Sequence, residues 1–161
     1  MSGEIRTEAA DGPVARALFE QYIALVRARV GAQFVPVERI FASEEAFTGA
    51  GAGFLVAYDA AGEPVGCGAL RALGDGPGIG EIKRMFVVGR ARGAGHGRRL
   101  LQALERLAAE HGHRAVRVLT TEVLSEACAL YEAEGYEPIE RIERAGEPVE
   151  IWMEKALPSP P

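Results

Sequence analysis

The chain has little cysteine and no long apolar run, and each shortage excludes a class of protein. Only two cysteines, Cys67 and Cys128, occur among the 161 residues, and they lie far apart without the close spacing of a zinc site. We expect both to be small buried side chains rather than disulfide partners or metal ligands. No window holds 18 uncharged apolar residues, so a membrane-spanning helix is not expected.

Basic residues are also in the minority. Asp and Glu number 23 against 18 Lys and Arg, which gives a net charge of −5. Nucleic-acid backbones attract basic surfaces, so a nucleic-acid partner is not expected. The first residues, Met-Ser-Gly-Glu-Ile-Arg-Thr-Glu, lack the apolar core of a signal peptide. We therefore expect a cytoplasmic protein without a membrane partner.

The length and composition suit one domain. With 48% hydrophobic and 25% charged residues, the chain has the composition of an ordinary globular protein. No internal repeat or linker divides it. We expect a single domain over residues 1–161, with a core from about residue 3 to 155 and a frayed proline-rich tail at 156–161.

The N-terminal half predicts two helices and three strands. Weak alternation at residues 3–8 indicates a first strand. Asp11 as a cap and Pro13 in the first turn predict a helix that runs to about Arg29 and ends at Gly31. A second helix is predicted after Pro36, with Val37, Ile40 and Phe41 on its apolar face and an extension to Phe47. Residues 54–58 and 65–73 then read as a hairpin with Gly62 in its turn.

The C-terminal half alternates strands and helices. The predicted elements are a strand at 79–88, a helix from about 95 to 110, a strand at 114–120, a helix at 125–134 and strands at 136–142 and 148–153. The helical crossover makes the strands at 79–88 and 114–120 parallel. The fold class is therefore a mixed α/β sheet of six to seven strands, flanked by about four helices.

The strand at 79–88 leads directly into a glycine turn. Alternation predicts two faces, one with Glu81, Lys83, Met85 and Val87 and the other with Ile82, Arg84, Phe86 and Val88. Gly93, Gly95 and Gly97 follow, and glycine lets backbone N–H groups approach a ligand closely. The start of the next helix favours anions. Four arginines surround the turn, namely Arg90, Arg92, Arg98 and Arg99. The local pattern predicts a phosphate or pyrophosphate site.

Two common phosphate motifs are excluded. A Walker loop needs G-x-x-x-x-G-K-[ST], but the only lysines are Lys83 and Lys155. A Rossmann turn needs G-x-G-x-x-G, whereas this turn has glycines at alternate positions.

The turn instead resembles the acetyl-CoA-binding motif R-x-x-G-x-G of the GCN5-related N-acetyltransferase (GNAT) superfamily. The matching residues are Arg92-Gly93-Ala94-Gly95-His96-Gly97. A second anchor, Ala127-x-x-Leu130-Tyr131-x-x-x-Gly135-Tyr136, is similar to that family's A-x-x-L-Y-x-x-x-G-[FY] segment. The resemblance implies a sheet that splays at its parallel strand pair.

The resemblance also implies how acetyl-CoA binds. Backbone groups of Phe86, Val87 and Val88 would pair with the pantetheine amides, and Ser125, which stands where the family often has asparagine, would offer a hydroxyl near the pantetheine arm. The N–H groups of residues 93–98 would hold the pyrophosphate. The predicted cofactor-binding set is thus Phe86, Val87, Val88, Arg92, Gly93, Ala94, Gly95, His96, Gly97, Arg98 and Ser125.

Acetyl transfer to an amine requires the amine to lose a proton and the departing thiolate to gain one. The resemblance places Tyr131 beside the sulfur as the acid, although a core-filling aromatic is the alternative. Glu81 is the candidate base, directly or through a water. It lies about six residues or roughly 20 Å from Val87 at strand rise, so an intervening water or an extended acceptor would be required. A solvated carboxylate at the strand end is the alternative. An N–H of Val87 or Val88 could stabilise the oxyanion of a tetrahedral intermediate.

The predicted function is direct acetyl transfer from acetyl-CoA to a primary amine of a small or amino-acid-like molecule. We expect no metal, because His111 and His113 lack converging carboxylates or cysteines. The alternatives are a non-catalytic acyl-CoA sensor and a protein or peptide N-acetyltransferase. The acceptor would be reached across residues 20–50, where Tyr22, Phe34 and Phe41 could line it or fill the core. Trp152 on the last strand suits the core or a homodimer surface.

Overall fold

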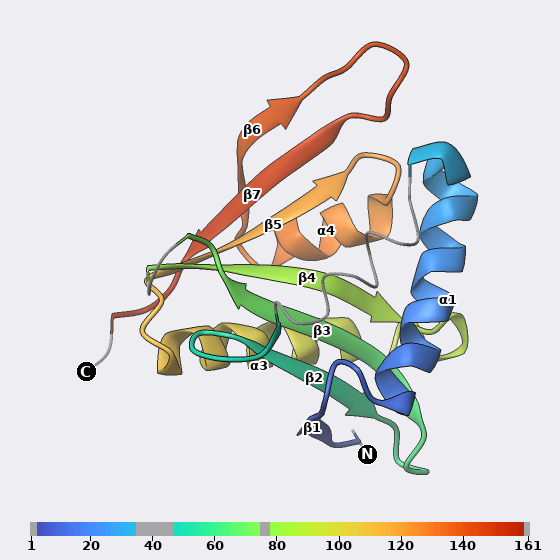
Figure 1. The fold of residues 1–161 in the computed structure, drawn as a ribbon, viewed down its shortest axis with the longest axis vertical. Helices are drawn as coiled ribbons and strands as arrows, with labels where there is room; N and C mark the ends of the chain where they lie inside the picture. The colour runs from blue at the N-terminus through green and yellow to red at the C-terminus, as the bar shows by residue number, and fades with distance from the viewer. Residues whose placement is uncertain (1–2, 35–46, 75–77, 160–161) are drawn as a thin grey trace.

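The computed structural model describes residues 3–34, 47–74 and 78–159, and in them seven strands form one sheet (Figure 1). The strand order is β1-β2-β3-β4-β5-β7-β6. The strands are β1 (Ile5–Thr7), β2 (Gly53–Tyr58), β3 (Pro64–Ala72), β4 (Ile79–Val87), β5 (Ala115–Thr121), β6 (Glu137–Ile142) and β7 (Glu150–Ala156). The predicted mixed sheet is confirmed.

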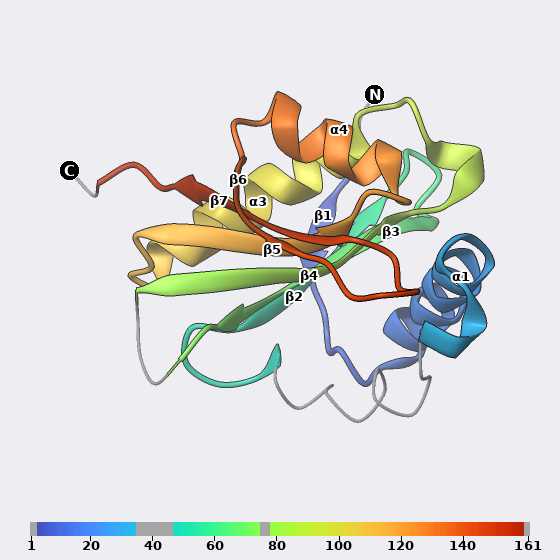
Figure 2. The same ribbon diagram turned by 90° about the horizontal axis from the view of Figure 1, so that it is seen from above.

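Three α-helices cover the sheet within the described residues. They are α1 (Pro13–Val30), α3 (His96–Glu110) and α4 (Ser125–Ala133), with short 3-10 turns η1 (Ala32–Phe34) and η3 (Gly89–Ala91). Seen from above, α3 and α4 lie on one face of the sheet and α1 lies on the other (Figure 2). The helix predicted after Pro36 lies outside the described residues.

Helix α1 begins and ends at glycines. Gly12 is its N-cap in extended conformation, and its carbonyl accepts the N–H of Arg16 at 3.0 Å. The prediction that Asp11 caps the helix is wrong, because Pro13 fixes the helix start one residue too late for the Asp11 side chain. Gly31 ends the helix with φ 109°, as predicted.

Strands β4 and β5 pair in parallel over only part of their length. Their paired residues run from Ile79 opposite Ala115 to Ile82 opposite Val118. β4 continues to Val87 and β5 to Thr121 without further paired residues between them. The predicted splay at the parallel strand pair is therefore present, and it opens toward the carboxyl ends of both strands.

A bulge interrupts β4 at Arg84, which has a φ of 56°. The register of β3 against β4 shifts there, because Ala69 lies opposite Lys83 whereas Cys67 lies opposite Phe86. Between these two pairs β4 therefore has one more residue than β3.

The bulge reverses the alternation of side chains. Met85 lies with Leu104 of α3 in the space beside Gly68. Phe86 packs against Tyr22 of α1 with ring centroids 5.9 Å apart. The prediction of one continuous alternation is therefore wrong beyond Lys83, since an extra residue moves each later side chain to the other face.

The core lies between α3 and the centre of the sheet. Leu100, Leu101, Leu104 and Ala108 of α3 are fully buried, so the predicted apolar stripe is confirmed. Gly66 and Gly68 of β3 leave the room this packing uses, because an added Cβ would lie 3.0 Å from Leu100 and 2.5 Å from Leu104.

The two cysteines are free thiols with different surroundings. Cys67 is fully buried in β3, and burial raises its pKa to about 12. Cys128 is only partly buried, so the prediction holds for Cys67 and is wrong for Cys128.

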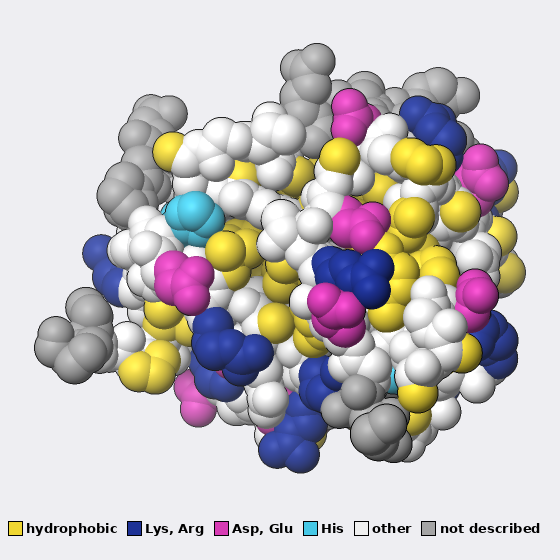
Figure 3. All heavy atoms as spheres, turned by 90° about the horizontal axis from the view of Figure 1, so that it is seen from below, with side chains coloured by type: hydrophobic (Ala, Val, Ile, Leu, Met, Phe, Trp, Pro, Cys, Tyr) yellow, Lys and Arg dark blue, Asp and Glu magenta, His cyan; other side chains and the backbone are white. Residues whose placement is uncertain are grey.

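Some features are absent from the described part of the chain. None of its helices is long and apolar enough to cross a membrane. Nor do its histidines, cysteines and carboxylates gather anywhere in a group of three or more that could hold a metal ion. The face seen from below carries both signs of charge side by side (Figure 3).

Leu104→Ala should lower the free energy of unfolding by about 2–5 kcal/mol, because removal of this fully buried side chain leaves a cavity against β3. Urea denaturation measures the change. Ile139→Ala is the control, because Ile139 is 48% exposed and should give a clearly smaller loss. Equal losses would contradict the placement of the core.

Candidate active site

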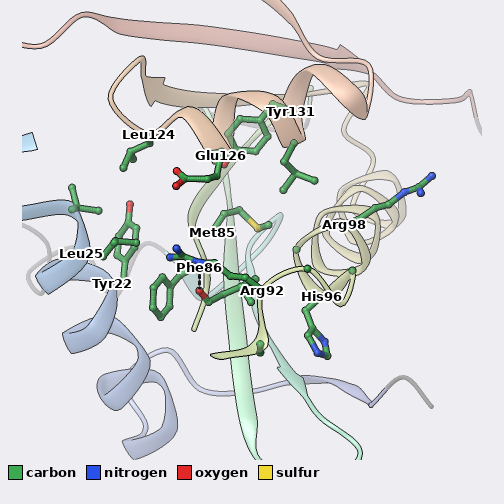
Figure 4. Close-up of a pocket in the computed structure, with 18 residues that line it drawn as sticks. Tyr22, Leu25, Met85, Phe86, Arg92, His96, Arg98, Leu124, Glu126 and Tyr131 are labelled. Atoms are coloured by element: carbon green, nitrogen blue, oxygen red, sulfur yellow. Dashed lines mark hydrogen bonds between the residues drawn. The ribbon is translucent and has the colours of Figure 1, made fainter. Parts of the chain in front are cut away.

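A cavity of about 420 Å³ lies where β4 and β5 part (Figure 4). The end of β4, the glycine turn, α1 and α4 all contribute to its wall. The lining residues are Tyr22, Leu25, Val26, Met85, Phe86, Val87, Ala91, Arg92, Gly93, Gly95, His96, Gly97, Arg98, Leu124, Glu126, Ala127, Leu130 and Tyr131. Both sequence anchors thus meet in one place, with the glycine turn at one end and α4 along the side.

The glycine turn delivers the start of α3 to the cavity. Gly93 and Gly95 have φ values of 85° and 84°, in the left-handed region that favours glycine. Gly95 caps α3, and the first intrahelical bond in this turn runs from the Arg99 N–H to the Gly95 carbonyl at 3.1 Å. The N–H groups of residues 96–98 precede that bond and have no intrahelical acceptor. Unpaired N–H groups at the start of a helix suit an anion.

The four arginines around the turn divide into two pairs. Arg92 and Arg98 line the cavity. Arg90 instead pairs with Asp59 at 3.4 Å, and Arg99 donates to the Gly3 carbonyl at 2.9 Å. Arg98 extends away from the other labelled side chains and donates to Glu134 at 3.0 Å. Arg92 is therefore the cavity arginine that the structure holds closest to β4.

His96 is a buried member of the turn. Its Nδ1 lies 2.5 Å from Nη2 of Arg99. Burial, followed by the charge of Arg99, lowers the pKa of His96, so the ring is neutral at pH 7 and accepts that bond.

The backbone of β4 presents alternate residues to the splay. The Val88 N–H donates to the Val65 carbonyl of β3 at 2.9 Å, so Val88 faces its antiparallel neighbour. By the two-residue period Phe86 does the same, and Val87 faces the opposite way. In agreement, the Val87 carbonyl accepts the Arg92 Nε–H at 3.2 Å. Of the three residues predicted to offer backbone groups, Val87 is the one whose groups point into the splay, because β3 occupies those of its neighbours.

Tyr131 lies in the wall of the cavity and is 6% exposed. Its ring packs against that of Tyr136, with centroids 5.6 Å apart. Burial raises the pKa of Tyr131 well above its usual value, so the hydroxyl stays protonated at neutral pH.

Glu81 lies outside the lining of the cavity. It is 3% exposed and accepts the Arg71 Nε–H at 2.6 Å. Its neighbours in register are Arg71 on β3 and Arg117 on β5, and Arg117 in turn pairs with Glu154 of β7 at 2.6 Å. Glu81 is thus one member of a row of alternating charges across four strands.

Ala94 and Ser125 also fall outside the lining. Ser125 lines a second cavity, on the side of α4 that faces β6 and β7. The residue at the start of α4 that does reach the main cavity is Leu124, its N-cap. The predicted hydroxyl therefore lies on the other side of the helix, since one residue turns a helix by about 100°.

Leu25, Val26 and Glu126 also line the cavity, and the sequence patterns did not predict them as site residues. A signal for the α1 residues was present, because Tyr22, Leu25 and Val26 follow helical spacing. Glu126 gave no such signal, since its role depends on a partner in α1.

Known proteins resemble this chain in sequence and in fold. The family model described as "Acetyltransferase (GNAT) domain" matches residues 50–138. An IAA acetyltransferase of Azospirillum brasilense is 40% identical over 105 residues, which cover 65% of this chain and 67% of that protein.

Solved structures share the fold. A GCN5-related N-acetyltransferase from Kribbella flavida matches with a TM-score of 0.79 at 25% identity, over 97% of this chain and 98% of that one. A GNAT superfamily phosphinothricin acetyltransferase from Sinorhizobium meliloti, in complex with AcCoA, matches with a TM-score of 0.76 at 22% identity. That match covers 98% of this chain and 89% of the other.

Gly95→Ala should lower the free energy of unfolding by about 1–2 kcal/mol, because Gly95 has φ 84° and a left-handed residue with a Cβ is strained. Thermal or urea unfolding measures this loss. Gly89→Ala is the matched control: both glycines have nothing within 4 Å of an added Cβ, but only Gly95 has a left-handed φ. A similar loss in both variants would contradict the strain argument.

Proposed function

The chain belongs to the GNAT acetyltransferase superfamily, and from this premise we propose that it transfers an acetyl group directly from acetyl-CoA to the primary amine of a small molecule. The observation that supports this most is a single cavity that joins the glycine turn at the start of α3 to Tyr131 of α4. An anion-binding end and a protonated phenol thus share one space. No metal is required for this chemistry.

The residues present fit acetyl-CoA. The N–H groups of residues 96–98 and the guanidinium of Arg92 suit a pyrophosphate. Val87 turns its backbone carbonyl into the splay, where the lone pair that Arg92 does not use would accept from a pantetheine amide N–H. When bound, acetyl-CoA supplies a thioester whose acetyl carbon an amine can attack.

Val87 has a second use in this arrangement. Charge develops on the acetyl oxygen during attack, and an N–H aimed at that oxygen lowers the barrier. The Val88 N–H is occupied by the Val65 carbonyl. We therefore assign this role to Val87, of the two residues considered from the sequence.

Tyr131 is the proposed acid. A thiol has a pKa near 8.5, so the departing sulfur gains from a proton donor at neutral pH. Burial raises the pKa of Tyr131, so its hydroxyl is protonated at neutral pH and is available to donate to the departing sulfur.

The amine must lose a proton, and Glu81 is the proposed base. Glu81 is buried against Arg71 and does not line the cavity. A role through a chain of waters is the version of the proposal that this position allows, because one water cannot span the roughly 20 Å between Glu81 and Val87. Direct contact between Glu81 and the acceptor is not part of the proposal.

The acceptor is proposed to be a small molecule that enters between α1 and α4. Relatives named for IAA and for phosphinothricin support a small-molecule acceptor. Tyr22, Leu25 and Val26 of α1 would face it.

Tyr131→Phe should lower kcat on the order of 10²-fold at neutral pH, because it removes the proton donor and keeps the ring. Release of free thiol from acetyl-CoA, with a panel of amines and lysine peptides, measures turnover. Acetylation of peptides alone would instead favour a protein acceptor.

Tyr136→Phe is the matched control for that variant. Tyr136 is equally buried beside Tyr131, but its hydroxyl donates to Glu105 at 2.8 Å and does not line the cavity. We expect it to lose stability and keep kcat. An unchanged rate in Tyr131→Phe would remove Tyr131 from the mechanism.

A further inference from the structure

One ion pair joins the two helices that flank the acceptor side of the cavity. Nη1 of Arg29, near the end of α1, lies 2.6 Å from Oε1 and 2.5 Å from Oε2 of Glu126 in the first turn of α4. α1 and α4 lie on opposite faces of the sheet (Figure 2). The pair therefore reaches around the open end of the splay.

Helical spacing explains why both residues are there. Tyr22 and Leu25 line the cavity, and Arg29 follows on the same face of α1. On α4, Glu126 shares a face with Leu130, which also lines the cavity. Arg29 itself does not line the cavity, so Glu126 is the member of this ion pair that faces the cavity.

The lining of the cavity carries charges of both signs. Arg92 and Arg98 lie at the glycine turn, where they suit phosphate. Among the residues that the structure describes in the lining, Glu126 is the one carboxylate. Figure 4 shows Glu126 on α4 opposite Tyr22 and Leu25 of α1. Glu126 is therefore the group of the described lining that can bind a cation, and Arg29 and Arg92 are the cations that already act on it.

Glu126 is better suited to bind an ammonium ion than to remove its proton. The hydrogen bond from Arg29 lowers the pKa of Glu126, and Arg92 adds a smaller effect in the same direction. The carboxylate is thus ionised at neutral pH and is a weak base. Arg29 reaches both oxygens through one nitrogen, and the Glu126 side chain is 58% exposed, so further lone pairs can accept from a ligand.

The wall around this carboxylate is apolar. Its side chains are those of Tyr22, Leu25, Val26, Phe86, Leu124 and Leu130. Such a wall suits an apolar body, and a second carboxylate there would be repelled by Glu126. Five residues, or about 7.5 Å of helix axis, separate Glu126 from Tyr131, so an amine held at Glu126 is near the proposed acid.

We propose that Glu126 binds the ammonium group of the acceptor and selects primary amines with an apolar body and no carboxylate beside the amine. This inference rests on the proposed function and names its acceptor class. Arg29 competes with the acceptor for the Glu126 carboxylate. Glu126 is thus a binding residue for the substrate, and the proton that leaves the amine does not go to it.

Two variants of this one ion pair separate recognition from structure. Glu126→Gln should raise the KM for phenethylamine at least 10-fold and leave the KM for acetyl-CoA unchanged. Arg29→Gln should lower the KM for phenethylamine, because it removes the competing cation. A merely structural ion pair predicts the same change in both variants, and that result would overturn the proposal.

Acceptor preference gives a second readout. Wild-type protein should acetylate phenethylamine with a kcat/KM at least 10-fold above that for phenylalanine, and Glu126→Gln should narrow the difference. A preference for phenylalanine that Arg29→Gln abolishes would overturn the proposal, because Arg29 would then bind the acceptor carboxylate.

Calorimetry keeps this test separate from the test of function. If wild-type protein releases no thiol with any amine, the proposed function fails. Phenethylamine is then titrated into the protein with CoA present. Binding that Glu126→Gln weakens at least 10-fold still supports Glu126 as the ammonium site, whereas equal affinity or no binding overturns it.

Discussion

Strands β4 and β5 hold each other through only four residue pairs, and the site depends on where that pairing stops. A peptide group in the middle of a sheet costs about 1–3 kcal/mol if it is buried without a hydrogen-bond partner. At the splay this cost falls on the groups of β4 that face away from β3, with Val87 the clearest case. Arg92 satisfies the Val87 carbonyl from the side. A ligand with amides of its own could pair with what remains, which is why the proposed acetyl-CoA site lies at the break in the sheet.

The three helices have different tasks around this break. α3 packs its buried leucines under β3 and β4, and its first turn then points at the cavity without further adjustment. α4 brings Tyr131 and Glu126 to the side wall, and α1 closes the opposite face with Tyr22 and Leu25. The buried core therefore places the start of α3 at the cavity, whereas the other end of the cavity lies between α1 and α4, which are joined by the Arg29–Glu126 pair.

Local signals in the sequence predicted the parts of this arrangement that depend on few residues. The glycine turn and the apolar stripe of α3 could be predicted, because backbone freedom and helical period are properties of a short segment. The bulge at Arg84 could not, because only the register against β3 reveals that one strand carries an extra residue. The cavity that Ser125 lines could not be predicted for a similar reason. A small error in the helical phase is enough to move a side chain from one cavity to the other.

Ion pairs between residues far apart in the chain could not be predicted from the sequence. Arg29 and Glu126 look like ordinary surface charges until α1 and α4 are placed on either side of the sheet. Glu81 shows the reverse case, because its position on the central strand was predicted while its burial against Arg71 was not. Charge partners of this kind are set by the topology, and no window of neighbouring residues contains them.

The bulge at Arg84 divides β4 into two segments that obey different rules. Before the bulge, β4 has a paired strand on both edges, so the effect of a substitution there depends mainly on how the new side chain packs. After it, the strand keeps one edge for β3 and offers the other to whatever enters the splay. The single extra residue at Arg84 shifts the alternation of side chains along β4 by one position. The extra residue is accommodated between two regular stretches of pairing, because Ala69 lies opposite Lys83 before it and Cys67 lies opposite Phe86 after it.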